Sequence, residues 1–94
     1  MKIVWSASAV RQLQQSVDYI ADKSQQDARN TRRRILDTVA RLALMPFSGR
    51  EGRVNHTREA VVPNTAYIVV YRVTPQSVEV IGLWHASQQW PFSF

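Results

Sequence analysis

A chain of 94 residues has room for one modest core, so we expect residues 1–94 to form a single domain. It contains no cysteine, which excludes disulfides and thiolate zinc sites. The formal net charge of +5 is concentrated between residues 29 and 58, where eight arginines stand against two carboxylates, a balance of +6. Such a block attracts an acidic partner, either nucleic acid or an acidic protein segment. Its alternative role is a solvated face that keeps the protein soluble.

The N-terminal region predicts a strand followed by a helix. The apolar run after Lys2 has only three residues before Ser6, too few for a signal peptide or a membrane span, so we expect a soluble cytoplasmic protein. Residues 2–5 are the expected strand, and Ser6 is a favourable N-cap for the helix. The following apolar residues recur at helical spacing: Ala9, Val10, Leu13, Val17, Ile20 and Ala21.

A second helix is predicted from Ser24 to about Leu44. Ser24 and Asp27 form a capping arrangement at its start, and Met45-Pro46 ends it. Its apolar stripe is expected to consist of Ala28, Ile35, Leu36, Val39, Leu42 and Ala43. Because both helices have one apolar side and are joined by a short break, they predict a hairpin that covers a sheet.

Four charged residues of the second helix have specific expected positions. Arg32 falls on the apolar side of the helical wheel, so we expect it to extend from the rim of the core. Arg33 and Asp37, and likewise Asp37 and Arg41, have the i,i+4 spacing of ion pairs.

Three strand-like runs follow a polar loop that we expect over residues 46–56. The runs are Thr57–Val62, Tyr67–Val73 and Val78–His85, and each is rich in β-branched and aromatic residues. Turn signals at Pro63-Asn64-Thr65 and Thr74–Ser77 separate them. The expected fold is α+β: an N-terminal strand, a helix hairpin and a three-stranded antiparallel meander, forming a four-stranded, mainly antiparallel sheet.

A simple turn at residues 74–77 predicts the register of the last two strands. Val73 then faces Val78, Tyr71 faces Val80, Val69 faces Gly82 and Tyr67 faces Trp84. The other face carries an Arg72–Glu79 ion pair and the pairs Val70–Ile81 and Ile68–Leu83. In the preceding strand, Arg58, Ala60 and Val62 are expected on this same face. One β-bulge would invert every side chain beyond it. Both faces are largely apolar, so either could meet the helices, and the other is expected to await a partner.

A series of short motifs is spread over most of the chain. They are Pro46-Phe47-Ser48-Gly49-Arg50, Thr57-Arg58-Glu59, the strand Tyr67-Ile68-Val69-Val70-Tyr71-Arg72-Val73, and Leu83-Trp84-His85 with Trp90-Pro91 behind it. Together with the order strand, helix hairpin, strands, they resemble the ParE/RelE superfamily of toxins from bacterial type II toxin-antitoxin systems. The Arg-Glu pair, the Tyr-x-Val-x-Tyr-Arg-Val strand and the Trp-Pro after a histidine resemble the ParE branch more closely. Ser87-Gln88 and Gln89 stand where basic residues are frequent in that branch.

The resemblance implies two different functions. A ParE-like toxin inhibits DNA gyrase by binding and blocks replication, whereas a RelE-like toxin is a ribosome-dependent mRNA endonuclease. Either kind is neutralised by a cognate antitoxin, which we expect to cover exposed apolar and basic surface and to fold as it binds. We expect the gyrase inhibitor, acting as a binding protein rather than as an enzyme.

The candidate residues for antitoxin and target contacts are charged and apolar. The charged set is Arg29, Arg33, Arg50, Arg53 and Arg58, and the apolar set is Trp84, His85, Trp90 and Phe92. Trp84 is equally suited to a core position and Trp90 to holding the tail. The arginines between residues 29 and 34 could also follow DNA phosphates, including gyrase-bound DNA, although no helix-turn-helix signature accompanies them.

An RNA-cleaving site would need a base, an acid and cations that stabilise the phosphate. The candidates for this alternative are Arg58, Arg72 and His85. In the predicted register Arg58 and His85 lie four residues apart along the sheet, about 13 Å, and Arg72 is occupied by Glu79. No residue is therefore assigned as catalytic. Two histidines without cysteines do not have the spacing of a metal site, and no cofactor motif is present.

Overall fold

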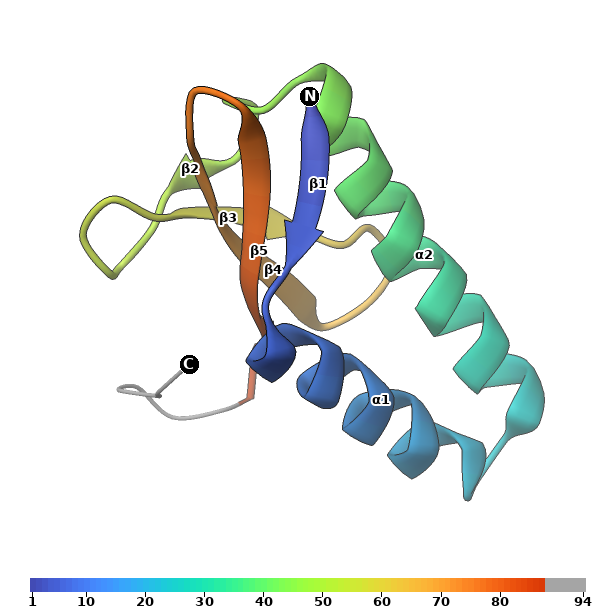
Figure 1. The fold of residues 1–94 in the computed structure, drawn as a ribbon. Coiled ribbons are helices and arrows are strands. Elements are labelled where there is room, and N and C mark those ends of the chain that lie inside the picture. The colour runs from blue at the N-terminus through green and yellow to red at the C-terminus, as the bar shows by residue number, and fades with distance from the viewer. Residues whose placement is uncertain (88–94) are drawn as a thin grey trace.

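The computed structural model describes residues 1–87, in which two helices pack on one face of a five-stranded sheet (Figure 1). In chain order the elements are β1 (Lys2–Trp5), α1 (Ala7–Ala21), α2 (Gln25–Leu44), β2 (Arg50–Glu51), β3 (Arg58–Val61), β4 (Tyr67–Val73) and β5 (Ser77–His85). The predicted α+β class and element order are therefore confirmed. Within this part of the chain, neither helix is long and apolar enough to cross a membrane. The candidates Trp90 and Phe92 lie outside the described residues.

The sheet is mixed, with the strand order β1-β5-β4-β3-β2. β1 runs parallel to β5, and the other neighbours are antiparallel, so the N-terminal strand lies beside the last strand. One prediction was wrong here. Residues 46–56 were expected to be a loop, yet Arg50 and Glu51 pair with Glu59 and Arg58 as the fifth strand. Two charged residues carry no alternation pattern, so this strand could not be seen in the sequence.

A β-bulge divides the β4–β5 pairing into a predicted and an unpredicted half. The pairs Val73–Val78, Arg72–Glu79 and Tyr71–Val80 are confirmed, but Val70 then faces Gly82, so that Ile81 is the extra residue. Beyond it the predicted register was wrong by one residue, and Tyr67 faces His85. The bulge lies where Ser6, distant in sequence, donates hydrogen bonds to the carbonyls of Val80 and Ile81.

The predicted side-chain direction in β3 was also wrong. Arg58 faces Tyr71 and Ala60 faces Val69, so these residues belong to the sheet face that meets the helices. The turn after Val62 is closed by a hydrogen bond from its amide to the Tyr67 carbonyl. Asn64 adopts a left-handed conformation in this turn, with φ of 61°. The actual turn shifts the assumed register by one residue, which exchanges the two faces.

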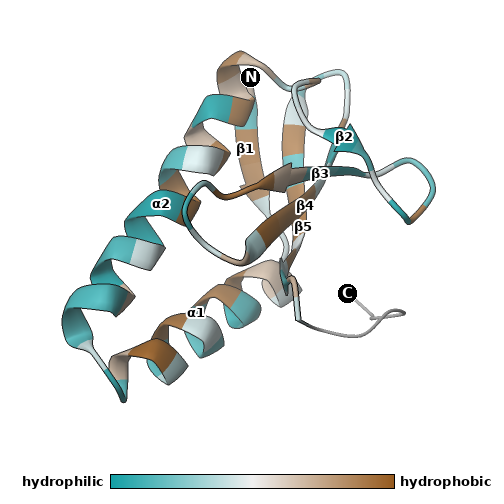
Figure 2. Ribbon diagram, turned by 180° about the vertical axis from the view of Figure 1, so that it is seen from behind, coloured by the Kyte–Doolittle hydropathy of each residue, from teal (hydrophilic) through white to brown (hydrophobic). Residues whose placement is uncertain are grey.

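The helices begin at the predicted caps, and their apolar stripes meet the sheet except at Val10, which was expected on the buried side of α1 but is 51% exposed. Ser6 Oγ accepts from the Ala9 amide and Ser24 Oγ accepts from the Asp27 amide. The buried core between helices and sheet comprises Ala9, Ile35, Val39, Leu42, Val62, Val69, Tyr71, Val78, Val80 and Leu83. Figure 2 shows hydrophobic residues along β4 and β5 and many hydrophilic residues along α2.

The predicted ion pairs of α2 were wrong. Among residues 1–87, Asp37 forms no ion pair with Arg33 or Arg41, and Arg41 instead hydrogen-bonds Thr38 Oγ1. Arg32 is exposed. The hairpin end of the two helices extends away from the sheet (Figure 1), although Ala28 in the first turn of α2 is buried.

Side chains from the start of the chain complete the outer edge of β5. β1 pairs with only the first residues of β5, from Ser77 to Val80. Beyond that point Ser6 Oγ donates to the Ile81 carbonyl, and Gln12 Oε1 of α1 accepts from the Leu83 amide at 2.8 Å. These polar side chains take the place of a longer β1, because a buried backbone group without a partner is costly.

The buried hydroxyl of Tyr71 holds the connection between α2 and β2. It donates to the Pro46 carbonyl at 2.8 Å and accepts from the Gly49 amide at 2.9 Å. Burial raises the pKa of this hydroxyl above its usual 10.0, while the Gly49 hydrogen bond and the charge of Arg58 oppose the increase. Gly49 is required by this contact, since a Cβ there would collide with the Tyr71 ring and hydroxyl.

Tyr71→Phe should destabilise the fold in a pH-dependent way. The variant leaves the Pro46 carbonyl and Gly49 amide unpartnered, so the free energy of unfolding should fall by about 1–3 kcal/mol at neutral pH. Because the folded-state pKa is raised, the stability from the neutral phenol is complete below pH 10 and is lost as the pH rises through the folded-state pKa. The difference between wild type and variant should therefore narrow above that pH. Urea unfolding across this range measures both effects.

Tyr67→Phe is the matched control for this prediction. The Tyr67 hydroxyl makes no hydrogen bond to the described residues, so its removal should change stability by less than about 0.5 kcal/mol. Equal losses in the two variants would contradict the role assigned to the Tyr71 hydroxyl.

Candidate functional site

A buried carboxylate organises the basic segment between β2 and β3. Glu59 is only 3% exposed, and its Oε1 accepts from the Arg50 guanidinium at 3.0 Å. Its Oε2 accepts from the Arg53 amide at 3.0 Å, with the Arg53 Nε at 4.0 Å. The side chains of Arg50 and Arg53 remain about half exposed, at 54% and 44%. Two of the predicted partner-binding arginines are therefore held in place while still reaching solvent.

Arg53 also lies over the sheet face that the helices leave free. Its guanidinium carbon is 3.8 Å from the centroid of the Trp84 ring, within the range of a cation–π contact. Trp84, Ile68 and Val70 form a second buried cluster on this face, at 3%, 7% and 1% exposure. The expected uncovered apolar face is therefore only partly present: its central cluster is buried, with Arg53 among the groups that cover it, whereas Val61, paired with Ile68 on the same face, is 54% exposed.

Arg58 is bound to the loop before β2 rather than to a carboxylate. Its Nη1 donates to the carbonyls of Gly49 and Phe47, at 2.8 and 3.2 Å. The guanidinium carbon lies 5.1 Å from the centroid of the Phe47 ring. The guanidinium of Arg58 is only partly buried, and its hydrogen bonds to these two carbonyls hold the loop in place.

Arg29 and Arg33 are arranged differently. Both are exposed on α2, four residues apart, and Arg29 hydrogen-bonds only the neighbouring Gln26 side chain. No carboxylate of the described residues forms an ion pair with either of them. An acidic partner could therefore pair with these two charges without breaking an internal ion pair.

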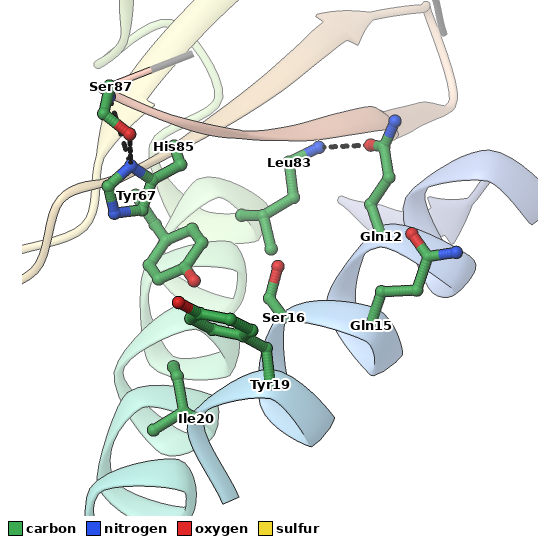
Figure 3. Close-up of a pocket in the computed structure, with 9 residues that line it drawn as sticks. All are labelled: Gln12, Gln15, Ser16, Tyr19, Ile20, Tyr67, Leu83, His85 and Ser87. Atoms are coloured by element: carbon green, nitrogen blue, oxygen red, sulfur yellow. Dashed lines mark hydrogen bonds between the residues drawn. The ribbon is translucent and has the colours of Figure 1, made fainter. Parts of the chain in front are cut away.

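His85 lies in a hollow between α1 and the paired ends of β4 and β5 (Figure 3). The hollow has a volume of about 600 Å³ and is lined by Gln12, Gln15, Ser16, Tyr19, Ile20, Tyr67, Leu83, His85 and Ser87. His85 packs edge-on against the Tyr67 ring, and its Nδ1 is 2.6 Å from Ser87 Oγ. None of the lining residues carries a permanent charge. The hollow can form hydrogen bonds and stack on rings, and no arginine or lysine lines it.

The three residues proposed for RNA cleavage are not brought together. Arg58 is level with Tyr71, and His85 is level with Tyr67, so they remain four residues apart along β4, about 13 Å. Arg72 points to the opposite face from both, where its predicted ion pair with Glu79 is confirmed. These three residues therefore do not come together as the phosphate-binding and proton-transferring group that cleavage requires.

Sequence reasoning missed several residues of these sites. Gln12 and Tyr19 of α1 line the His85 hollow, and neither was among the candidate residues predicted from the sequence. Glu59 was seen only as half of an Arg-Glu motif, and its burial depends on the β2 pairing that the sequence did not predict. Its one signal in the sequence was a carboxylate placed within a predicted strand, directly after Arg58.

Glu59→Gln should destabilise the protein more than the same change at Glu79. The amide retains the shape of Glu59 but removes a buried charge that Arg50 and the Arg53 amide bind, so we expect a loss of about 1–3 kcal/mol. Glu79 is 31% exposed and pairs with an exposed Arg72, so Glu79→Gln should cost at most about 1 kcal/mol. Thermal or urea unfolding of both variants measures this, and equal effects would argue against an organising role for Glu59.

Comparison with known proteins places this geometry in a family. Residues 3–90 match the family described as "ParE toxin of type II toxin-antitoxin system, parDE". The protein named "Putative toxin Y4kP" of Sinorhizobium fredii is 39% identical over 90 residues, which cover 96% of this chain and 93% of that protein.

Two solved structures share the fold. The structure "Chromosomal ParDE TA system from P. aeruginosa" is 18% identical with a TM-score of 0.81 and covers 93% of this chain and 97% of its own. The "YoeB/ParE toxin from Agrobacterium tumefaciens" is 19% identical with a TM-score of 0.63, covering 90% and 98%. The family match spans nearly the whole described chain, and the fold agrees with it. The chain therefore belongs to the ParE toxin family of type II toxin-antitoxin systems.

Proposed function

We propose that this toxin inhibits DNA gyrase by binding to it and so blocks replication, and that a cognate antitoxin neutralises it. Family membership over residues 3–90 is the observation that carries this proposal. The separation of Arg58, Arg72 and His85 over two faces and two levels of the sheet supports inhibition by binding over cleavage of mRNA.

The antitoxin that we propose is an acidic or amphipathic segment which contacts two kinds of surface. Arg29 and Arg33 on α2 offer charges free of internal ion pairs, whereas Arg50, Arg53 and Arg58 offer charges in fixed positions. The neutral, partly aromatic hollow beside His85 could receive an apolar side chain of the same segment. Trp84 contributes to this interaction only indirectly, because it is buried beneath Arg53.

The direct test is DNA supercoiling by purified gyrase with increasing amounts of the antitoxin-free toxin and with ATP. We expect loss of supercoiling together with accumulation of cleaved DNA. A ribosome-dependent mRNA cleavage assay with the same sample is the matched control and should show no cleavage. Unaffected gyrase with cleaved mRNA would replace this proposal by the endonuclease alternative.

Antitoxin binding should depend on Arg29 and Arg33 in a salt-sensitive way. The double variant Arg29→Ala/Arg33→Ala should bind the antitoxin about three- to tenfold more weakly at low salt, and the difference should shrink near 1 M salt as charges are screened. Arg11→Ala, an exposed arginine of α1, is the control and should bind as wild type does. Titration calorimetry at several salt concentrations measures this. An unchanged affinity and salt slope in the double variant would remove α2 from the proposed interface.

A further inference from the structure

Exposed apolar side chains collect where α2 ends beside the N-terminus. Leu44 is 83% exposed, Met45 and Phe47 are each 64% exposed, and Met1 is 48% exposed. The Met1 amino group donates to the Ala43 carbonyl at 2.7 Å, which brings the start of the chain to the last turn of α2. We call these four residues the end patch. A cluster of this kind is unusual on a surface that has no partner.

The backbone that carries the end patch is firmly held. The Met45 carbonyl accepts from the amide and hydroxyl of Ser48, and the Pro46 carbonyl accepts from Tyr71. The carbonyls of Phe47 and Gly49 accept from Arg58. A buried tyrosine and a partly buried arginine thus fix a loop whose own apolar side chains point into solvent. Such a loop loses little further backbone freedom when it binds.

The shape and charge of the end patch define its occupant. Met1, Leu44 and Met45 are largely exposed, and Phe47 lines one side of an open hollow with Glu51 and Val54. Apolar side chains exposed to this degree can enter a preformed pocket in a folded protein. The borders are basic: Arg58 lies beside Phe47, and the exposed Arg41 precedes Leu44 by one turn. A second copy is disfavoured, because a symmetric contact would bring these arginines together.

We infer that the end patch is the surface with which the toxin enters an apolar, carboxylate-bordered pocket of its folded target protein. This inference rests on the proposed function, in which the target is gyrase. The antitoxin segment, by contrast, is assigned to Arg29, Arg33, Arg50, Arg53 and Arg58 and to the hollow beside His85. Of these residues, Arg58 also borders the end patch, where it lies beside Phe47.

The test uses the double variant Met45→Ser/Phe47→Ser of the full chain in two assays. One assay is bacterial growth after induced expression, which requires no assumption about the target. The other is supercoiling by purified gyrase holoenzyme. We expect growth arrest to be lost and the half-inhibitory concentration for gyrase to rise at least tenfold, the effect of losing one well-buried anchor. Phe47→Leu keeps an apolar side chain and should retain most inhibition.

Val10→Ser is the matched control, since Val10 is 51% exposed on α1 outside the end patch. It should behave as wild type, and unfolding curves should show that all variants are folded. Wild-type inhibition of gyrase by the double variant overturns the inference but leaves the proposed function intact. A third outcome is that wild type leaves gyrase unaffected but arrests growth, and that the double variant no longer arrests growth. This outcome overturns gyrase as the target and supports the end patch as the surface that binds another target. Absence of any growth arrest by the wild-type chain overturns both.

Discussion

The hydroxyl of Tyr71 is the contact on which the arrangement of the molecule's basic half depends. Tyr71 lies on the central strand β4 and is fully buried, yet its hydroxyl reaches main-chain groups on both sides of the loop between α2 and β2. This one hydroxyl therefore fixes the chain just after the end of α2 and just before the start of the edge strand β2. A phenylalanine would fill the same volume but could not fix that position, because packing alone gives no directional preference.

From that fixed loop the arginines divide into two groups with different physical roles. Arg50, Arg53 and Arg58 are bound by Glu59 and by loop carbonyls, so their positions are determined by the fold. Arg29 and Arg33 lie on the outer side of α2 and have no ion pair among residues 1–87. A composition count treats these charges as equal. In the binding that we propose, the first group would contribute shape and charge together, and the second mainly long-range attraction.

Local patterns were sufficient to predict most of the fold. The caps at Ser6 and Ser24, the apolar spacing of α2 and the limits of β1 and β4 all follow from short-range chemistry that acts within a few residues. The Arg72–Glu79 pair was predictable because it lies close to the turn that sets the register. What could not be predicted depends on contacts distant in sequence. The bulge at Ile81 lies against Ser6, β2 exists only through β3, and the end patch requires knowledge of which apolar residues the core leaves out.

The candidate site shows the same limit. His85 was selected from the sequence, but its surroundings come from α1, so neither the hollow nor its lack of charge was evident. Conversely, Trp84 was weighed equally as a contact and as a core residue, and only the position of Arg53 shows that it is buried.

The lengths of the strands have a consequence for how this protein behaves in concentrated solution. The two longest strands, β4 and β5, are interior. The edges of the sheet are the four residues of β1, the two charged residues of β2, and Ala60 and Val61 of β3, which β2 does not pair with. Ser6 and Gln12 occupy the remaining backbone groups of β5 that would otherwise be open. Short, charged or capped edges are poor templates for joining the sheet of another molecule. The most strand-prone sequence of this chain is thereby kept from edge-to-edge aggregation.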